Sequence, residues 1–229
     1  IRDMNDDSNL DEGLQITRIA QLQYINAISQ HIPPKAEGLD IKYPVAKLTN
    51  LDLKKLYQHY RNQLNKQIEP EQRELIKLEM LAVVREVLFR NTCNTDKQGK
   101  FNPGIYLYPV QMLTILNSIF TDGNILNQVN TGQGKTAITA VTAAMLAGEN
   151  KEGVVDISSS NAELAEDGIK EMKSFYTALG LGCKQIKAGS SELTDYNDNS
   201  IHDGSDCSVT HMIPCRIRRR SRFRWTRNQ

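Results

Sequence analysis

Apolar residues recur at helical spacing in the first part of the chain, whereas short β-branched runs interrupt that spacing farther on. The spacing predicts an N-terminal set of helices over residues 14–28, 53–64 and 75–88. Farther along, it predicts helices over residues 108–120, 135–146 and 162–179. Short strands are predicted between them, over residues 124–129, 153–157 and 182–186. Strands that alternate with helices are typical of an α/β fold with a parallel sheet, preceded here by an α-helical region.

The pattern divides the chain into three parts. Residues 1–95 are expected to form a helical N-terminal region, and residues 96–189 a partial parallel-sheet domain. Periodicity is lost after Gly189, so residues 190–229 are expected to be an irregular or disordered tail. Residues 216–229 contain seven Arg and no acid, while the preceding residues have 21 basic against 27 acidic side chains. The body is therefore mildly acidic and the tail strongly basic.

Composition narrows the class of protein. Among the 229 residues, 39% are hydrophobic and 24% charged, which is typical of soluble globular domains. No apolar run approaches the roughly 20 residues of a membrane-spanning helix. Four cysteines are too few for a disulfide scaffold, so a reducing compartment is the default. The chain begins at Ile1 without Met, and we expect a fragment.

The most informative motif is TGQGKT at residues 131–136, between a predicted strand and a predicted helix. Gly132 and Gly134 permit main-chain N–H groups to turn toward phosphate oxygens, and the helix N-terminus adds its positive dipole end. Lys135 would contact the β- and γ-phosphates, and Thr136 would place its hydroxyl on Mg²⁺. The alternative is an ordinary glycine turn followed by a chance Lys-Thr pair.

Several stretches together carry a family resemblance. Where the common phosphate loop has its first glycine, this chain has Val129, and the string VNTGQGKT resembles motif I of superfamily 2 helicases and SecA-type translocases. LAVVREV at 81–87 and YPVQ at 108–111 resemble two further SecA elements. Residues 154–181 resemble the SecA segment that ends in an LGL turn. From about residue 45 to 188, the chain thus resembles the nucleotide-binding domain of SecA, the preprotein translocase ATPase.

The resemblance implies a RecA-like, DEAD-like P-loop domain that binds ATP and Mg²⁺. It implies that Gln111 reads the adenine, because a Gln amide offers both an acceptor and a donor. It also implies a polypeptide substrate, a membrane translocation channel and a location in the cytoplasm or peripheral to the membrane. Lys135 and Thr136 are the expected catalytic residues, and Thr136 the metal ligand. The expected nucleotide-binding residues are Gln111, Thr131, Gly132, Gln133, Gly134, Lys135 and Thr136.

The sequence departs from SecA in ways that bear on hydrolysis. Glu166 stands where the family usually has Arg. No Walker B or DEAD-type acidic pair follows the glycine loop, although such a pair holds Mg²⁺ and orients water in motors of this class. A frameshift or truncation would produce the unrelated last forty residues. We therefore expect nucleotide binding with poor or absent hydrolysis.

Two other functions remain open. Residues 161–165 also resemble an element of RNA helicases of superfamily 2, although a helicase would have Arg where this chain has Ala162. Alternatively, the N-terminal helices are a non-enzymatic interaction module and the glycine loop is a remnant. The sequence leaves the oligomeric state open.

The tail offers two weaker hypotheses. Its arginines alternate with Phe223 and Trp225, which would suit nucleic acid, but non-specific attraction of polyanions is the simpler interpretation. Four side chains are spaced so that they could ligate zinc, but chance residues in a loose tail explain them better. These are His202, Cys207, His211 and Cys215.

Overall fold

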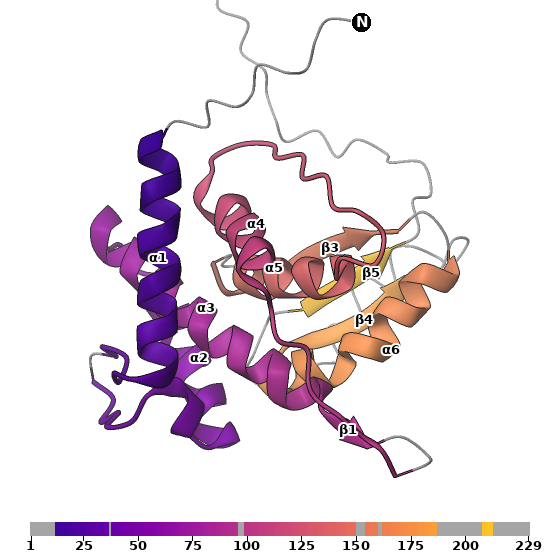
Figure 1. Ribbon diagram of the computed structural model, residues 1–229, viewed down its shortest axis with the longest axis horizontal. Coiled ribbons are helices and arrows are strands. Elements are labelled where there is room, and N and C mark those ends of the chain that lie inside the picture. Colours follow the sequence, from indigo (N-terminus) through magenta and orange to yellow (C-terminus); the bar gives the residue numbers. More distant parts are fainter. Residues whose placement is uncertain are drawn as a thin grey trace, which may run out of the picture.

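The computed structural model describes residues 12–36, 38–95, 99–149, 154–159, 162–186 and 208–212 (Figure 1). The helices in these residues are α1 (Glu12–Gln30), α2 (Asn50–Leu64), α3 (Pro70–Thr92), α4 (Pro109–Phe120), α5 (Lys135–Glu149) and α6 (Ala162–Leu179), with the 3₁₀ turn η1 (Val45–Lys47). The strands are β1 (Asn94–Thr95), β2 (Phe101–Asn102), β3 (Val154–Ser158), β4 (Gly182–Ile186) and β5 (Ser208–Met212). The six predicted helices are all confirmed.

Helix α3 lies at the centre of the helical packing. It begins at Pro70, a residue that suits the first helical position because its missing N–H would have no intrahelical partner. Helices α1, α2, α5 and α6 all contact it. The five consecutive residues Met80 to Val84 are fully buried, and five consecutive helical positions cover every side of a helix. The helix is therefore enclosed by its neighbours over this stretch.

A buried carboxylate joins the N-terminal helices to α3. Glu79 accepts hydrogen bonds from the hydroxyls of Tyr24 at 2.8 Å and Tyr60 at 2.6 Å. It also accepts from the main-chain N–H of Lys35 at 2.8 Å. Burying a charged group is costly unless it is hydrogen-bonded, and these three donors meet that requirement. The interaction joins α1, α2 and the connector between them to one position of α3.

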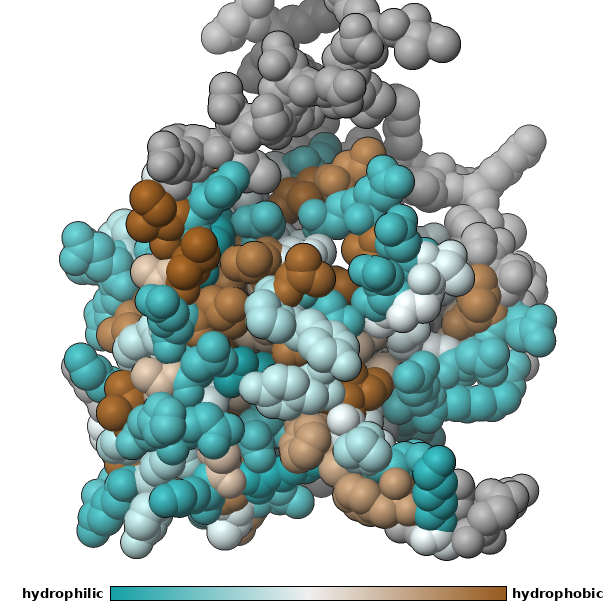
Figure 2. All heavy atoms as spheres, in the orientation of Figure 1, coloured by the Kyte–Doolittle hydropathy of each residue, from teal (hydrophilic) through white to brown (hydrophobic). Residues whose placement is uncertain are grey.

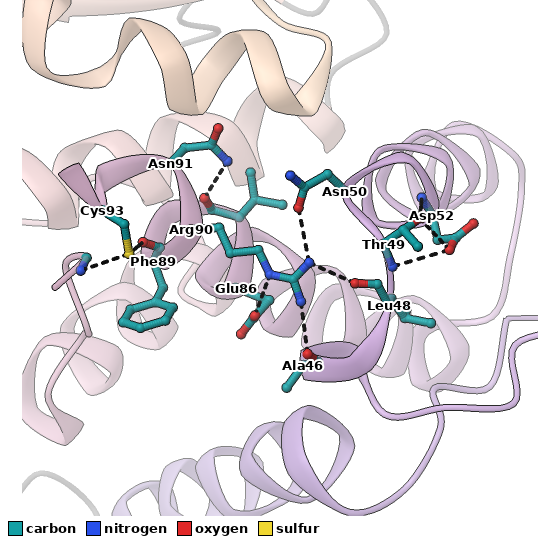
Figure 3. Close-up of polar contacts among 12 residues, drawn as sticks. Ala46, Leu48, Thr49, Asn50, Asp52, Glu86, Phe89, Arg90, Asn91 and Cys93 are labelled. Atoms are coloured by element: carbon teal, nitrogen blue, oxygen red, sulfur yellow. Dashed lines mark hydrogen bonds and ion pairs between the residues drawn. The ribbon is translucent and has the colours of Figure 1, made fainter. Parts of the chain in front are cut away.

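The end of α3 is fixed by Arg90 (Figure 3). Its guanidinium donates to the carbonyls of Ala46 at 2.9 Å and Leu48 at 2.7 Å, and to the side chain of Asn50 at 3.0 Å. It also forms an ion pair with Glu86, one turn earlier, at 2.7 Å. The planar guanidinium has five N–H donors, so one side chain can hold η1 and the start of α2 against α3.

Strands β3, β5 and β4 form a small parallel sheet in that order. Ser208 is the register partner of both Val154 and Gly182, so β5 lies between the other two strands. Helix α6 contacts β4 and β5, and α5 contacts β3 and β5. In Figure 1, α5 and α6 lie next to the sheet, and α1 lies apart from it. The predicted strands at 153–157 and 182–186 are confirmed as β3 and β4.

The predicted fold class, a parallel-sheet P-loop domain preceded by helices, is wrong for this chain. The described residues are mostly helical, and none of their strands exceeds five residues. The strand predicted over residues 124–129 is absent from the described structure. Leu126 and Ile125 in that segment are 98% and 37% exposed, so these two side chains are not buried in a sheet. A strand needs a partner for its main-chain groups, and β3 pairs instead with β5.

The domain boundaries proposed from the sequence remain predictions. Helices from both sides of residue 95 pack together, since α5 contacts α2 and α3. Residues 208–212, within the segment expected to be irregular, form β5. Residues 190–207 and 213–229 lie outside the described residues.

Candidate functional site

The glycine loop forms a tight turn that leads directly into α5. Gly132 and Gly134 have φ angles of +80° and +75°, in the left-handed region that side chains with a Cβ rarely adopt. The N–H of Gln133 donates to the carbonyl of Asn130 at 3.3 Å. The N–H of Ile138 donates to the carbonyl of Gly134 at 3.1 Å, which begins the helix. The two glycines are therefore required by the shape of the main chain.

The start of α5 is electrostatically positive and accessible. Lys135 and Thr136, its first two residues, are both exposed. The first turn of a helix leaves N–H groups without intrahelical acceptors, and these carry the positive end of the helix dipole. No acidic residue stands in the first turn of α5 to neutralise it. This end of the helix can thus attract an anion, and the residues present fit a phosphate group.

Gln111 lies against the loop, through a hydrogen bond to its main chain. The amide nitrogen of Gln111 donates to the carbonyl of Gln133 at 2.9 Å, and its amide oxygen accepts from the N–H of Tyr108 at 2.8 Å. The whole residue is 8% exposed. A Cβ added to Gly134 would lie 2.5 Å from the Gln111 nitrogen, so the glycine also makes room for this contact. The structure thus brings all the predicted nucleotide-binding positions into one neighbourhood.

Helix α5 is held from behind by α2 and α3. The hydroxyl of Tyr57 donates to the carbonyl of Ala144 at 2.8 Å. A Cβ added to Gly148 would overlap the side chain of Met80, so α5 approaches α3 closely there. Small residues fill most of the buried face of α5. The loop therefore begins a helix that the core fixes in position.

Lys77 joins the C-terminal ends of α4 and α5. Its ammonium group forms an ion pair with Glu149 at 2.7 Å and donates to the carbonyl of Ile119 at 3.1 Å. It also lies 5.3 Å from the centre of the Phe120 ring. Burial raises the pKa of Glu149, while the hydrogen bond and charge of Lys77 act in the opposite direction. The sequence gives no sign of this pair, because the two residues are far apart along the chain.

A groove of about 750 Å³ runs along α5 beside the loop. Ligand sites in proteins commonly have volumes of about 300–1,000 Å³. Lys135, Thr139 and Thr142 line the groove from α5, together with residues 126–129 and Asp156 of β3. Lys135 therefore belongs both to the glycine loop and to the lining of a groove large enough for a ligand.

A smaller hollow of about 240 Å³ lies between α1 and α4. Leu14, Ile19 and Leu113 supply apolar parts of its lining. Ile16 and Ile19 are 62% and 50% exposed on α1. Figure 2 shows apolar side chains over the α1 and α4 region of this face, with mostly hydrophilic side chains below them. This hollow lies outside the predicted nucleotide site.

The remaining sequence predictions concern Glu166 and the possible zinc ligands of the tail. Glu166, which stands where SecA usually has Arg, forms an exposed ion pair with Lys170 at 2.8 Å. Among the described residues, no three His, Cys, Asp or Glu side chains gather as a metal site would require. The side chains of the four candidate zinc ligands and the arginine tail lie outside what the structure describes.

The family comparison covers the N-terminal helices and the glycine loop together. The family model described as the SecA DEAD-like domain matches residues 21–201, which include the N-terminal helices as well as the glycine loop. The search of curated proteins finds no match. No helix in the described part of the chain is both long and apolar enough to cross a membrane. Because the family model covers most of its length, the chain belongs to the SecA DEAD-like domain family.

Proposed function

We propose that this chain binds ATP, with Mg²⁺, through the loop at residues 131–136 and the start of α5. The observation that carries the proposal is the pair of left-handed glycines directly before the exposed Lys135 and Thr136. Membership of the SecA DEAD-like family supports a nucleotide-binding, translocation-related domain. The loop N–H groups and Lys135 would hold the phosphates, and the Thr136 hydroxyl would contact Mg²⁺. Bound Mg²⁺ would supply charge neutralisation at the β- and γ-phosphates.

The test is a titration of the full chain with a fluorescent ATP analogue. Lys135→Ala removes the cation at the helix start, and we expect it to weaken binding by at least tenfold. Lys47→Ala is the matched control, because Lys47 is exposed on η1 and outside the loop. Equal binding by the wild type and the Lys135→Ala variant would refute the site.

We further propose that hydrolysis by this chain is weak. The sequence has no Asp-Glu pair after Thr136, and motors of this class use such a pair to hold the metal and orient water. Phosphate release measured with saturating ATP and Mg²⁺ tests this directly. Turnover near the typical enzyme value of about 10 per second would contradict it.

We propose that the cellular role is in a SecA-like protein-translocation motor, in the cytoplasm or peripheral to the membrane, with polypeptide as the substrate. Family membership supports this role. Any residual ATPase should then rise on addition of an unfolded polypeptide. Stimulation by single-stranded RNA alone would indicate a helicase instead.

A further inference from the structure

The groove along α5 has an apolar wall that stays open among the described residues. Leu126 is 98% exposed and Leu146 is 39% exposed, and both line the groove. Val155 and Ile157 of β3 line it as well, and they are only partly buried. Strands of a parallel sheet are normally covered on both faces. An apolar segment that covered this wall would therefore complete the burial of β3 and of the outer face of α5.

The chain leaves the sheet beside this groove. Met212, the last residue of β5, is the register partner of Ser158 on β3, and Ser158 lines the groove. Neighbouring strands lie about 4.8 Å apart, so the chain continues from a point next to the groove. Phe223 follows eleven residues after Met212, and this length can span at most about 36 Å. The part of α5 that lines the groove rises by only about 17 Å, from Lys135 to Leu146. The segment after β5 is thus long enough to reach the whole wall.

That segment has the sequence pattern of a strand with one apolar face. Arg224 separates Phe223 from Trp225, and Arg222 precedes them. In an extended backbone, alternate side chains point to opposite sides, so the two rings would share one side and the two arginines the other. Aromatic side chains bury a large apolar area. The segment can therefore place both rings against an apolar wall while its arginines stay in solvent.

Charge also favours contact between this segment and the rest of the chain. Residues 216–229 contain seven Arg and no acid, whereas residues 1–215 have 21 basic against 27 acidic side chains. Opposite net charges attract each other within about 8 Å at physiological ionic strength. Because the segment is tethered beside the groove, its effective concentration there is high. The groove is therefore more accessible to this segment than to a separate molecule.

We propose that the C-terminal segment docks in the groove along α5, with Phe223 and Trp225 against the wall formed by Leu126, Leu146 and β3. The docked segment covers side chains that β3 and α5 leave exposed. It lies beside Lys135, because Lys135 lines the same groove. The docking does not depend on the proposed function, since no nucleotide takes part in it.

The test is the fluorescence of Trp225, the only tryptophan in the sequence, in the full chain. A pocket of this size commonly buries about 70–90% of its occupant, and collisional quenching scales with exposed surface. Docking should therefore lower the quenching constant of Trp225 for acrylamide, a neutral quencher, about threefold. The groove variant combines Leu126→Lys with Leu146→Lys, which removes the apolar wall and repels arginines. The control variant combines Leu51→Lys with Leu164→Lys, because these leucines are 60% and 54% exposed and do not line the groove.

We expect equally weak quenching in the wild type and the control variant, and about threefold stronger quenching in the groove variant. A cooperative urea transition in each variant shows that the fold is intact. Strong quenching in the wild type would overturn the proposal, because the segment would then lie in solvent. Equal quenching in the two variants, whether weak or strong, would also overturn it, since the groove would then not be the docking site. Wild-type quenching that weakens as the protein concentration rises would count against it as well, because a second copy would then supply the segment.

Discussion

The two glycines of the loop differ in what surrounds them, so replacing each by alanine should have different consequences. Gly132 has a φ of +80° and open space where a Cβ would stand. Gly134 has a φ of +75°, and there a Cβ would lie 2.5 Å from the amide nitrogen of Gln111. Gly132→Ala therefore adds backbone strain alone, whereas Gly134→Ala adds strain and displaces Gln111.

The magnitudes follow from these two causes. A residue with a Cβ in the left-handed region costs about 1–2 kcal/mol, which lowers the population of the binding-competent loop by about 5- to 30-fold. Displacement of Gln111 also removes its hydrogen bond to the Gln133 carbonyl, worth about 1 kcal/mol, or roughly another fivefold. We expect Gly134→Ala to weaken triphosphate binding several times more than Gly132→Ala.

Calorimetric titration with tripolyphosphate and Mg²⁺ measures the loss of binding affinity in each variant. A cooperative urea unfolding transition confirms that each variant is folded. Gly123→Ala is the control, because Gly123 has a φ of +94° and open space but lies outside the glycine loop. In the Gly134→Ala background, Gln111→Ala should weaken triphosphate binding less than it does in the wild type. The reason is that the displaced Gln111 side chain has already lost its hydrogen bond to the Gln133 carbonyl. Equal losses for Gly132→Ala and Gly134→Ala, or an equal loss for Gly123→Ala, would refute the reasoning.

Three further predictions concern stability, measured by urea unfolding. Burial raises the pKa of Glu149 above its ordinary 4.5, so the contribution of Glu149 to the free energy of unfolding is greatest below pH 4.5 and falls as the pH rises through the folded pKa. Glu149→Gln should flatten the fall in stability that the wild type shows as the pH rises above 4.5, and unchanged curves would contradict this. Tyr60→Phe removes a hydrogen-bond donor to the buried Glu79 and should lower the free energy of unfolding by about 1.5–3 kcal/mol. An unchanged urea midpoint would show that this hydrogen bond contributes nothing to stability. Arg90→Lys leaves fewer N–H donors for the carbonyls of Ala46 and Leu48 and should lower the free energy of unfolding by about 1 kcal/mol. An unchanged free energy of unfolding would mean that the lysine ammonium group can replace the guanidinium at these carbonyls.

Local sequence patterns predicted the helices because each pattern reports a face that must be buried. Helix α6 and strand β4 begin and end where the sequence places them, at Ala162–Leu179 and Gly182–Ile186. The glycine loop was also predictable, because a left-handed turn before a helix requires glycine at particular positions. These features depend on residues that are close together in the chain.

The remaining features depend on partners that local patterns do not reveal. Residues 124–129 have the apolar content of a strand, but a strand also needs a neighbour, and β3 pairs with β5. The partner of Gln111 on the loop is a main-chain carbonyl, which no residue type identifies. The ion pair between Lys77 and Glu149 joins helices that only the tertiary packing brings together. The prediction failed where the decisive contact was distant in sequence.

The claim on which the account depends is that the loop at residues 131–136 encloses a triphosphate. The most direct measurement is the change in the amide ¹H–¹⁵N resonances of the full chain during titration with tripolyphosphate and Mg²⁺. The account predicts that the largest shifts occur at Gly132, Gly134, Lys135 and Thr136, and that they disappear in Lys135→Ala. Saturable binding with the largest shifts elsewhere, or no shifts at these four residues, would contradict it.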